Sequence, residues 1–176
     1  MKKIVILALA ALSLLTGCDN EKNDTAITTS EGNFIAQKET LSSQNDADIR
    51  TDLLAINSVV NTSNTKASEL NQELVSASKN SDSSAIKVIM GRSKALLEST
   101  NNSLFGLKIK SQEVQDIRIG IYQGNMISIK LYELYLKDNQ TDKDKEEIEL
   151  LQRQMVELQQ SIGSKLDQLN SQYKVQ

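Results

Sequence analysis

Apolar residues recur every three or four positions through most of the chain after residue 44, the spacing that places them on one side of an α-helix. Four such segments predict helices over about 45–79, 82–105, 108–137 and 142–173. The first series comprises Ile49, Leu53, Ile56, Val60, Ala67, Leu70, Leu74 and Ala77, and Ser63 interrupts it as a soft spot. The last approaches a heptad repeat, with Ile148, Leu151, Met155, Leu158, Ile162, Leu166, Leu169 and Tyr173. We therefore expect an all-α fold, an elongated antiparallel helical bundle or coiled coil of three to four long helices.

Short polar stretches separate these segments. Asn80-Ser81-Asp82 ends the first predicted helix and provides an N-cap for the second. Thr141 with Asp144 resembles a capping box at the start of the last one. The junction near Gly106 is the least defined, because the apolar pattern resumes at once. Either the second and third helices are separate, or they form one continuous helix of about 85 Å.

The amino-acid composition agrees with long helices and excludes several common kinds of catalytic and metal site. The 176 residues include no proline, which would break a helix interior, and only 3% are aromatic. There is no histidine and one cysteine, so the chain supplies no Ser-His-Asp triad, Cys-His dyad or histidine-bound zinc. The net charge of −3 argues against a nucleic-acid binder. We expect no enzymatic activity, no cofactor and no nucleic-acid partner.

The first 17 residues have the features of a secretory signal peptide. Lys2 and Lys3 precede an apolar run from Ile4 to Leu15, and small residues follow. The run is about a dozen residues, whereas a membrane-spanning helix needs roughly 20. We expect residues 1–17 to be removed on export.

The end of this segment carries a second signal. Leu15, Thr16, Gly17 and Cys18 resemble the lipobox of bacterial lipoproteins. The resemblance implies that the Cys18 thiol receives a diacylglyceryl group, that cleavage precedes Cys18, and that its new amino group is acylated, commonly with palmitate. Two or three acyl chains anchor a protein durably to a membrane.

The next two residues bear on sorting. Asp19 resembles the signal that keeps lipoproteins in the inner membrane of enteric-type bacteria, and Asn20 is compatible with it. The resemblance implies the periplasmic face of the inner membrane, with the outer membrane as the alternative.

Residues 18–43 are rich in polar side chains, and we interpret them as a flexible linker before a helical domain at 44–176. Phe34 and Ile35 form an apolar pair within the linker. We interpret them as a passing apolar pair, and docking on the body or on a partner is the alternative.

One stretch has nearly the spacing of a calcium-binding loop, with oxygen-bearing side chains at Asp138, Gln140, Asp142, Asp144 and Glu149. Lys143 stands where such a loop needs glycine. We therefore expect a solvated turn and helix start, and no metal site.

Two sets of residues in the third predicted helix indicate how it packs. Gly120 and Gly124 share a face and permit close approach or a bend, with a dedicated dimer contact as the alternative. Tyr122, Tyr132 and Tyr135 predict packing at the edge of the core, with a partner contact as the alternative.

These features predict a membrane-anchored lipoprotein of the cell envelope that faces the periplasm. We expect it to act as a non-enzymatic protein-interaction or structural module, with a protein partner or self-association through its helical faces. The alternatives are an inhibitor or immunity-type lipoprotein that neutralises an envelope-active toxin, and a surface-exposed adhesin or spacer.

Overall fold

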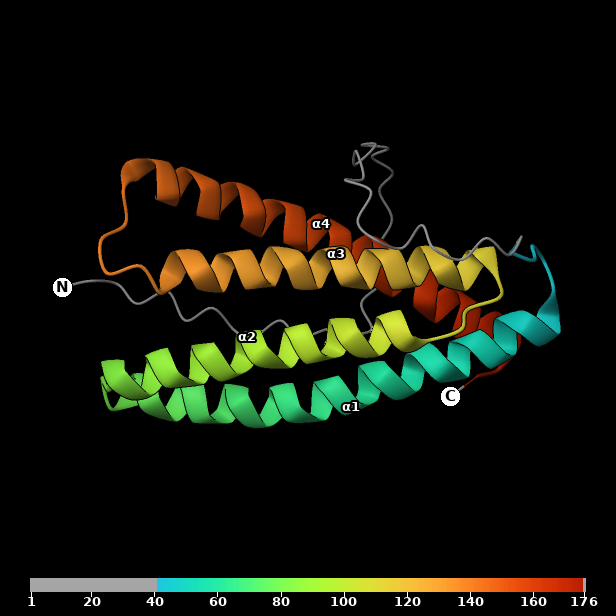
Figure 1. The fold of residues 1–176 in the computed structure, drawn as a ribbon, viewed down its shortest axis with the longest axis horizontal. Coiled ribbons are helices and arrows are strands. Elements are labelled where there is room, and N and C mark those ends of the chain that lie inside the picture. Colours follow the sequence, from blue (N-terminus) through green and yellow to red (C-terminus); the bar gives the residue numbers. More distant parts are fainter. Residues whose placement is uncertain (1–40, 176) are drawn as a thin grey trace.

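The computed structural model describes residues 41–175, which form four helices packed as an elongated antiparallel bundle (Figure 1). The helices are α1 (Asp46–Lys79), α2 (Ser83–Gly106), α3 (Gln112–Tyr135) and α4 (Asp142–Tyr173). The predicted all-α helical bundle is therefore confirmed. The predicted signal peptide and most of the predicted linker lie outside the described residues.

Local side chains begin three of the helices. The Asn45 side chain accepts hydrogen bonds from the first backbone N–H groups of α1, Asp82 does so for α2, and Thr141 for α4. Each satisfies backbone donors that have no partner within the helix. The α1–α2 and α3–α4 junctions therefore follow from short polar sequences.

The start of α3 differs from the expected position near residue 108. Residues 107–110 form no helix, and Ser42 pairs with this segment in an isolated parallel bridge to Ser111. The Ser42 N–H donates to the Lys110 carbonyl, and the Ser42 carbonyl accepts from the Gln112 N–H. Because these backbone groups are bonded to a distant part of the chain, α2 and α3 cannot join. The alternative of one continuous helix is wrong.

All four helices pack together at one end of the bundle, whereas toward the other end they pack in pairs. The largest core cluster contains residues of all four helices and lies where α1 begins and α4 ends. Farther along, separate clusters join α1 to α2, α2 to α3, and α3 to α4. α1 and α4 share fewer contacts than the pairs that follow one another in sequence. The first half of α4 therefore packs mainly on α3 (Figure 1).

Gly120 marks the close approach of α3 and α4. A Cβ atom at this position would lie 2.6 Å from Cδ1 and 2.7 Å from Cγ1 of Ile162. At Gly124 it would meet Leu158 Cδ2 at an ordinary 3.8 Å. Gly120 thus serves packing within one chain.

Replacing Gly120 with alanine is expected to lower the free energy of unfolding by about 1–2 kcal/mol, since overpacking outweighs the better helix propensity of alanine. Gly91 is the matched control, because a Cβ there meets nothing within 4 Å. Gly91→Ala is expected to raise stability by about 0.5–1 kcal/mol. Urea unfolding followed by circular dichroism measures both, and equal effects would contradict the close-packing argument.

Candidate functional site

The residues predicted to anchor and sort the protein lie outside the described part of the chain. These are the lipidation site Cys18, the preceding lipobox residues Leu15, Thr16 and Gly17, and the sorting residues Asp19 and Asn20. Their roles stay predictions. The described residues instead show which polar groups hold the helices and which surfaces remain exposed.

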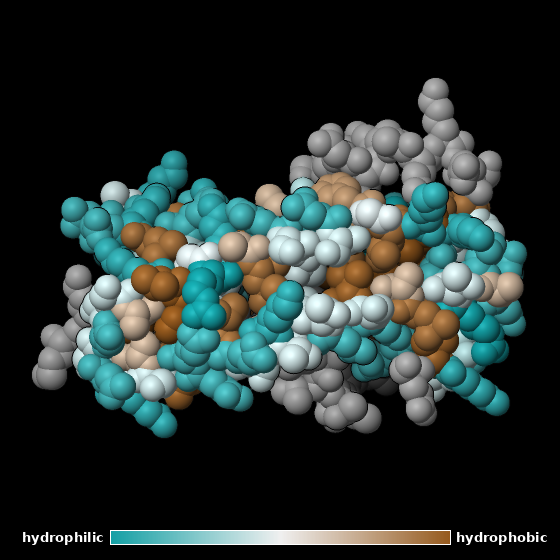
Figure 2. Space-filling model, turned by 60° about the horizontal axis from the view of Figure 1, so that its bottom comes forward, coloured by the Kyte–Doolittle hydropathy of each residue, from teal (hydrophilic) through white to brown (hydrophobic). Residues whose placement is uncertain are grey.

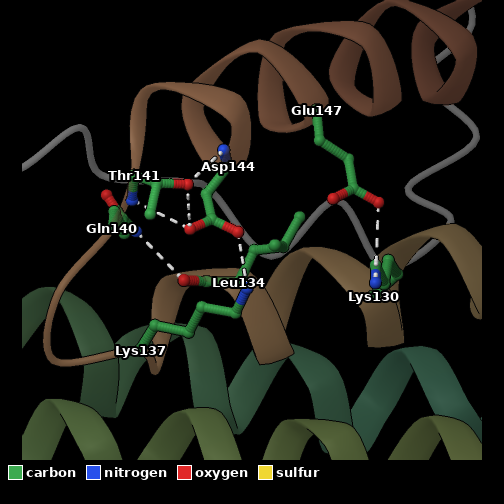
Figure 3. Close-up of polar contacts among 7 residues, drawn as sticks. All are labelled: Lys130, Leu134, Lys137, Gln140, Thr141, Asp144 and Glu147. Atoms are coloured by element: carbon green, nitrogen blue, oxygen red, sulfur yellow. Dashed lines mark hydrogen bonds and ion pairs between the residues drawn. The ribbon is translucent and has the colours of Figure 1, made fainter.

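The turn between α3 and α4 is held by a capping box (Figure 3). The Asp144 N–H donates to the Thr141 hydroxyl at 3.2 Å, and the Thr141 N–H donates to the Asp144 carboxylate at 2.8 Å. Lys137, just after α3, also donates to this carboxylate. The predicted capping box is confirmed, and it ties the start of α4 to the end of α3.

Two further contacts hold the same turn (Figure 3). The Gln140 amide donates to the Leu134 carbonyl at 3.1 Å, and Lys130 of α3 lies 3.5 Å from the Glu147 carboxylate of α4. Figure 3 shows Lys130 and Glu147 pointing toward each other from neighbouring helices. These contacts fix how α4 leaves α3.

The acids that resemble a calcium loop do not converge. Asp138 pairs with Lys87 at 2.6 Å, and Asp142 pairs with Lys145 at 2.6 Å. These lysines lower the pKa of both carboxyl groups. Between residues 41 and 175, no three His, Cys, Asp or Glu side chains are grouped to hold a metal ion. The Asp138, Asp142 and Asp144 carboxylates are engaged in ion pairs and capping.

The capping box makes part of the stability depend on pH. Hydrogen bonds from Lys137 and then from Thr141 hold the pKa of Asp144 well below its usual range. A carboxyl whose pKa is depressed by folding stabilises the protein above its unfolded pKa, and this contribution is lost as pH falls. The stability difference between the natural protein and Asp144→Asn is expected to stay constant at neutral pH and to shrink below about pH 4. Thermal unfolding at several pH values measures it, and a difference independent of pH would contradict the pairing.

Asp52 is the best-buried acid described, with 2% of its surface exposed. Its Oδ2 accepts hydrogen bonds from the Lys110 N–H at 2.9 Å, the Ser111 N–H at 2.7 Å and the Ser111 hydroxyl at 2.7 Å. Ser111 is the N-cap residue of α3, but its own side chain caps nothing. Asp52 of α1 therefore caps α3 from another helix.

Arg118 of α3 is 3% exposed. It binds the start of the segment that connects α2 to α3, whereas Asp52 binds the end of this segment. Its guanidinium donates to the Leu107 carbonyl at 2.7 Å, the Leu104 carbonyl at 3.3 Å and the Gln115 side chain. Burial lowers the pKa of Arg118, and the negative charge of Asp52 opposes this shift. The segment between α2 and α3 is thus held by two buried ionised groups of opposite sign.

Uncharged polar pairs join the helices at other levels. The Asn125 amide donates to Asn101 at 2.7 Å, and the Ser63 and Thr100 hydroxyls lie 2.9 Å apart. Ser63 therefore occupies the apolar stripe of α1 with a hydroxyl that is hydrogen-bonded to Thr100 of α2. Buried polar groups that are bonded contribute to the specificity of packing.

The three tyrosines of α3 lie in different surroundings. Tyr132 is buried between α2 and α3, and burial raises its pKa to about 12. Tyr135 is partly buried, and its hydroxyl accepts from Gln152 of α4 at 3.0 Å. The Tyr122 ring meets the Phe105 ring edge-on, with centroids 5.2 Å apart. Tyr122 and Tyr135 are thus partly buried, as expected for the edge of the core, whereas Tyr132 is a buried member of a core cluster.

Apolar side chains reach the surface of all four helices. The large ones with more than a third of their surface exposed are Leu54, Val88, Phe105, Met126, Leu150 and Val156. Figure 2 shows, on one face, separate apolar patches among hydrophilic side chains. Such patches are candidate contact surfaces, whereas single exposed apolar residues are ordinary.

No helix within residues 41–175 combines the length and the apolar character needed to cross a membrane. Residues 50–174 match the model of the family described as "Uncharacterised lipoprotein PM1805". No curated protein and no solved structure matches the chain. The match lies in the helical body, whereas the lipobox resemblance lies in residues 15–18, so two separate parts of the chain indicate a lipoprotein. Because the match covers most of its length, the chain belongs to the family "Uncharacterised lipoprotein PM1805".

Proposed function

We propose that this lipoprotein is held by acyl chains on Cys18 at the periplasmic face of the inner membrane and that its bundle binds another envelope protein without catalysing a reaction. The observation that carries the proposal is the exposure of apolar side chains on the first half of α4. Leu150 is 48% exposed and Val156 is 54% exposed.

The arrangement of the helices makes this part of α4 accessible. Arg50 donates to the Tyr173 carbonyl at 2.6 Å and Asn57 donates to Asn170 at 3.0 Å, which joins the start of α1 to the end of α4. The first half of α4 packs instead on α3, where Ile148 meets apolar residues of that helix. Leu150 and Val156, six residues apart, therefore lie on either side of the buried stripe of α4, and both sides are open to a partner, in the way that amphipathic helices bind in protein complexes.

The buried ionised groups support a binding role over a catalytic one. Asp52 and Arg118 are hydrogen-bonded to backbone groups of the α2–α3 connection, and Asp144 is engaged in a helix cap. A general acid or base must instead reach a substrate atom. These three groups stabilise the bundle.

Crosslinking in living cells, followed by purification of the lipidated protein, tests the binding role. One stoichiometric partner is expected, and Leu150→Glu with Val156→Glu is expected to abolish its recovery. Leu54→Glu is the matched control, because Leu54 is 56% exposed on α1. Equal recovery with the α4 variant and the control would overturn the assignment of the binding surface to α4.

Cell fractionation tests the anchor separately. Cys18→Ser is expected to prevent cleavage before residue 18 and to remove the protein from the membrane fraction that contains the mature lipoprotein. Separation of inner and outer membranes by density then compares the natural protein with Asp19→Ser. Unchanged processing and membrane association of Cys18→Ser would overturn the anchoring proposal.

A further inference from the structure

An apolar patch lies on the outer surface where α2 and α3 meet, and we name it the α2–α3 patch. It comprises Phe105, Tyr122 and Met126. The Phe105 and Tyr122 rings are in edge contact at 5.2 Å, and Phe105 is 39% exposed. Met126 is 44% exposed, four residues after Tyr122 on the same face of α3. Thioether and aromatic groups together favour contact with another ring.

The path of the chain before α1 leads toward this patch. Ser42 forms a parallel bridge with Ser111, through bonds of 2.8 Å to the Lys110 carbonyl and 2.9 Å from the Gln112 N–H. In a parallel pair, residues that precede one partner lie beside residues that precede the other. Leu41, the first described residue, therefore lies on the side of Ser42 that faces Lys110, and this direction leads along the α2–α3 connection to the end of α2, where Phe105 lies.

The linker has an apolar pair at a suitable distance. Phe34 and Ile35 lie seven and six residues before Leu41, the first described residue. An extended chain covers about 3.3 Å per residue, so Phe34 can lie about 23 Å from Leu41. Met126 lies 15 residues after Ser111, which is about 22 Å along a helix. The pair can thus reach the whole patch.

We propose that Phe34 and Ile35 dock on the α2–α3 patch of the same molecule. The occupant is this segment because the described chain from Ser42 back to Leu41 is directed toward the patch, and a short connection gives the pair a high effective concentration there. Docking fastens the linker along the bundle and leaves residues 19–33 to span the distance from the lipid anchor. It also covers the patch, so that the exposed apolar side chains of α4 remain for other proteins.

A tryptophan at position 34 tests the docking, because the natural chain contains no tryptophan. Phe34→Trp is placed in the complete mature chain carrying Cys18→Ser, and emission is compared with and without Met126→Glu. Docking predicts a blue-shifted maximum and weak acrylamide quenching, both of which Met126→Glu abolishes. Ser58→Glu, at an exposed position on α1, is the matched control and is expected to leave both unchanged. Circular dichroism verifies that each variant is folded.

Disulfide formation in the same background provides a second measurement, since Cys18 is the one natural cysteine. Ile35→Cys with Met126→Cys is expected to give an intramolecular disulfide in several-fold higher yield than Ile35→Cys with Ser58→Cys. Equal yields, or emission typical of exposed tryptophan in every variant, would overturn the proposal. Disulfides between molecules, with a blue shift that rises with protein concentration, would overturn it in favour of a second copy on the patch.

Discussion

Replacing Asp52 with alanine is expected to lower the free energy of unfolding by about 3–5 kcal/mol, one of the two largest effects of any single substitution proposed for this protein. The substitution removes three hydrogen bonds from the start of α3 and leaves the buried Ser111 N–H without an acceptor. It also removes the negative charge that stabilises the positively charged form of the buried Arg118 side chain. Urea unfolding at neutral pH, followed by circular dichroism, measures the loss.

Two further variants distinguish the loss of the Asp52 hydrogen bonds from the effect on stability of removing a negative charge. Asp167→Ala removes the same charge from an exposed position of α4 and is expected to change stability by less than about 0.5 kcal/mol. Asp52→Asn keeps an acceptor oxygen and is expected to recover part of the loss. If Asp52→Ala is no more destabilising than Asp167→Ala, the capping of α3 by α1 is wrong.

Arg118→Met is expected to destabilise the protein by about 3–4 kcal/mol, although methionine fills much of the same volume. The Leu107 carbonyl loses the guanidinium donor, and the Leu104 carbonyl keeps the Leu107 N–H at 3.3 Å. The Asp52 carboxylate also loses the nearby positive charge. The guanidinium stays charged at neutral pH despite its burial, so the substitution removes a buried ion. Urea unfolding measures the effect, with exposed Arg153→Met as the control.

A double-mutant cycle tests whether the two buried groups act together. Asp52→Asn with Arg118→Met is expected to cost less than the sum of the single substitutions, because each single change leaves an uncompensated charge. Strict additivity would mean that Asp52 and Arg118 stabilise the connection independently.

The local sequence was sufficient to predict the helices and two of the three junctions. Asn45, Asp82 and Thr141 each bond to backbone groups within three residues, so their effect depends on neighbours in the chain. The apolar spacing also placed the buried face of α1 correctly, because a helix turns at a constant angle per residue.

The role of the buried polar groups was missed, although a signal existed. Asp52 lies three residues after Ile49 and four before Ile56, within the apolar stripe of α1. Arg118 lies four residues after Val114 and three before Ile121, within the stripe of α3. A charged residue in such a stripe must be bonded, because burial of an unpaired charge is too costly. The pattern does not show to which group.

The sequence by itself determined the helical class, the buried faces of α1 and α4 and the caps made by neighbouring residues. The tertiary structure alone decided where α3 begins, because Asp52 and Ser42 bind a segment that is close in space and distant in the chain. It also decided that α1 and α4 pack most closely at one end of the bundle. Interactions over a few residues are set by helix geometry, whereas bonds across 59 residues exist only after the helices have packed.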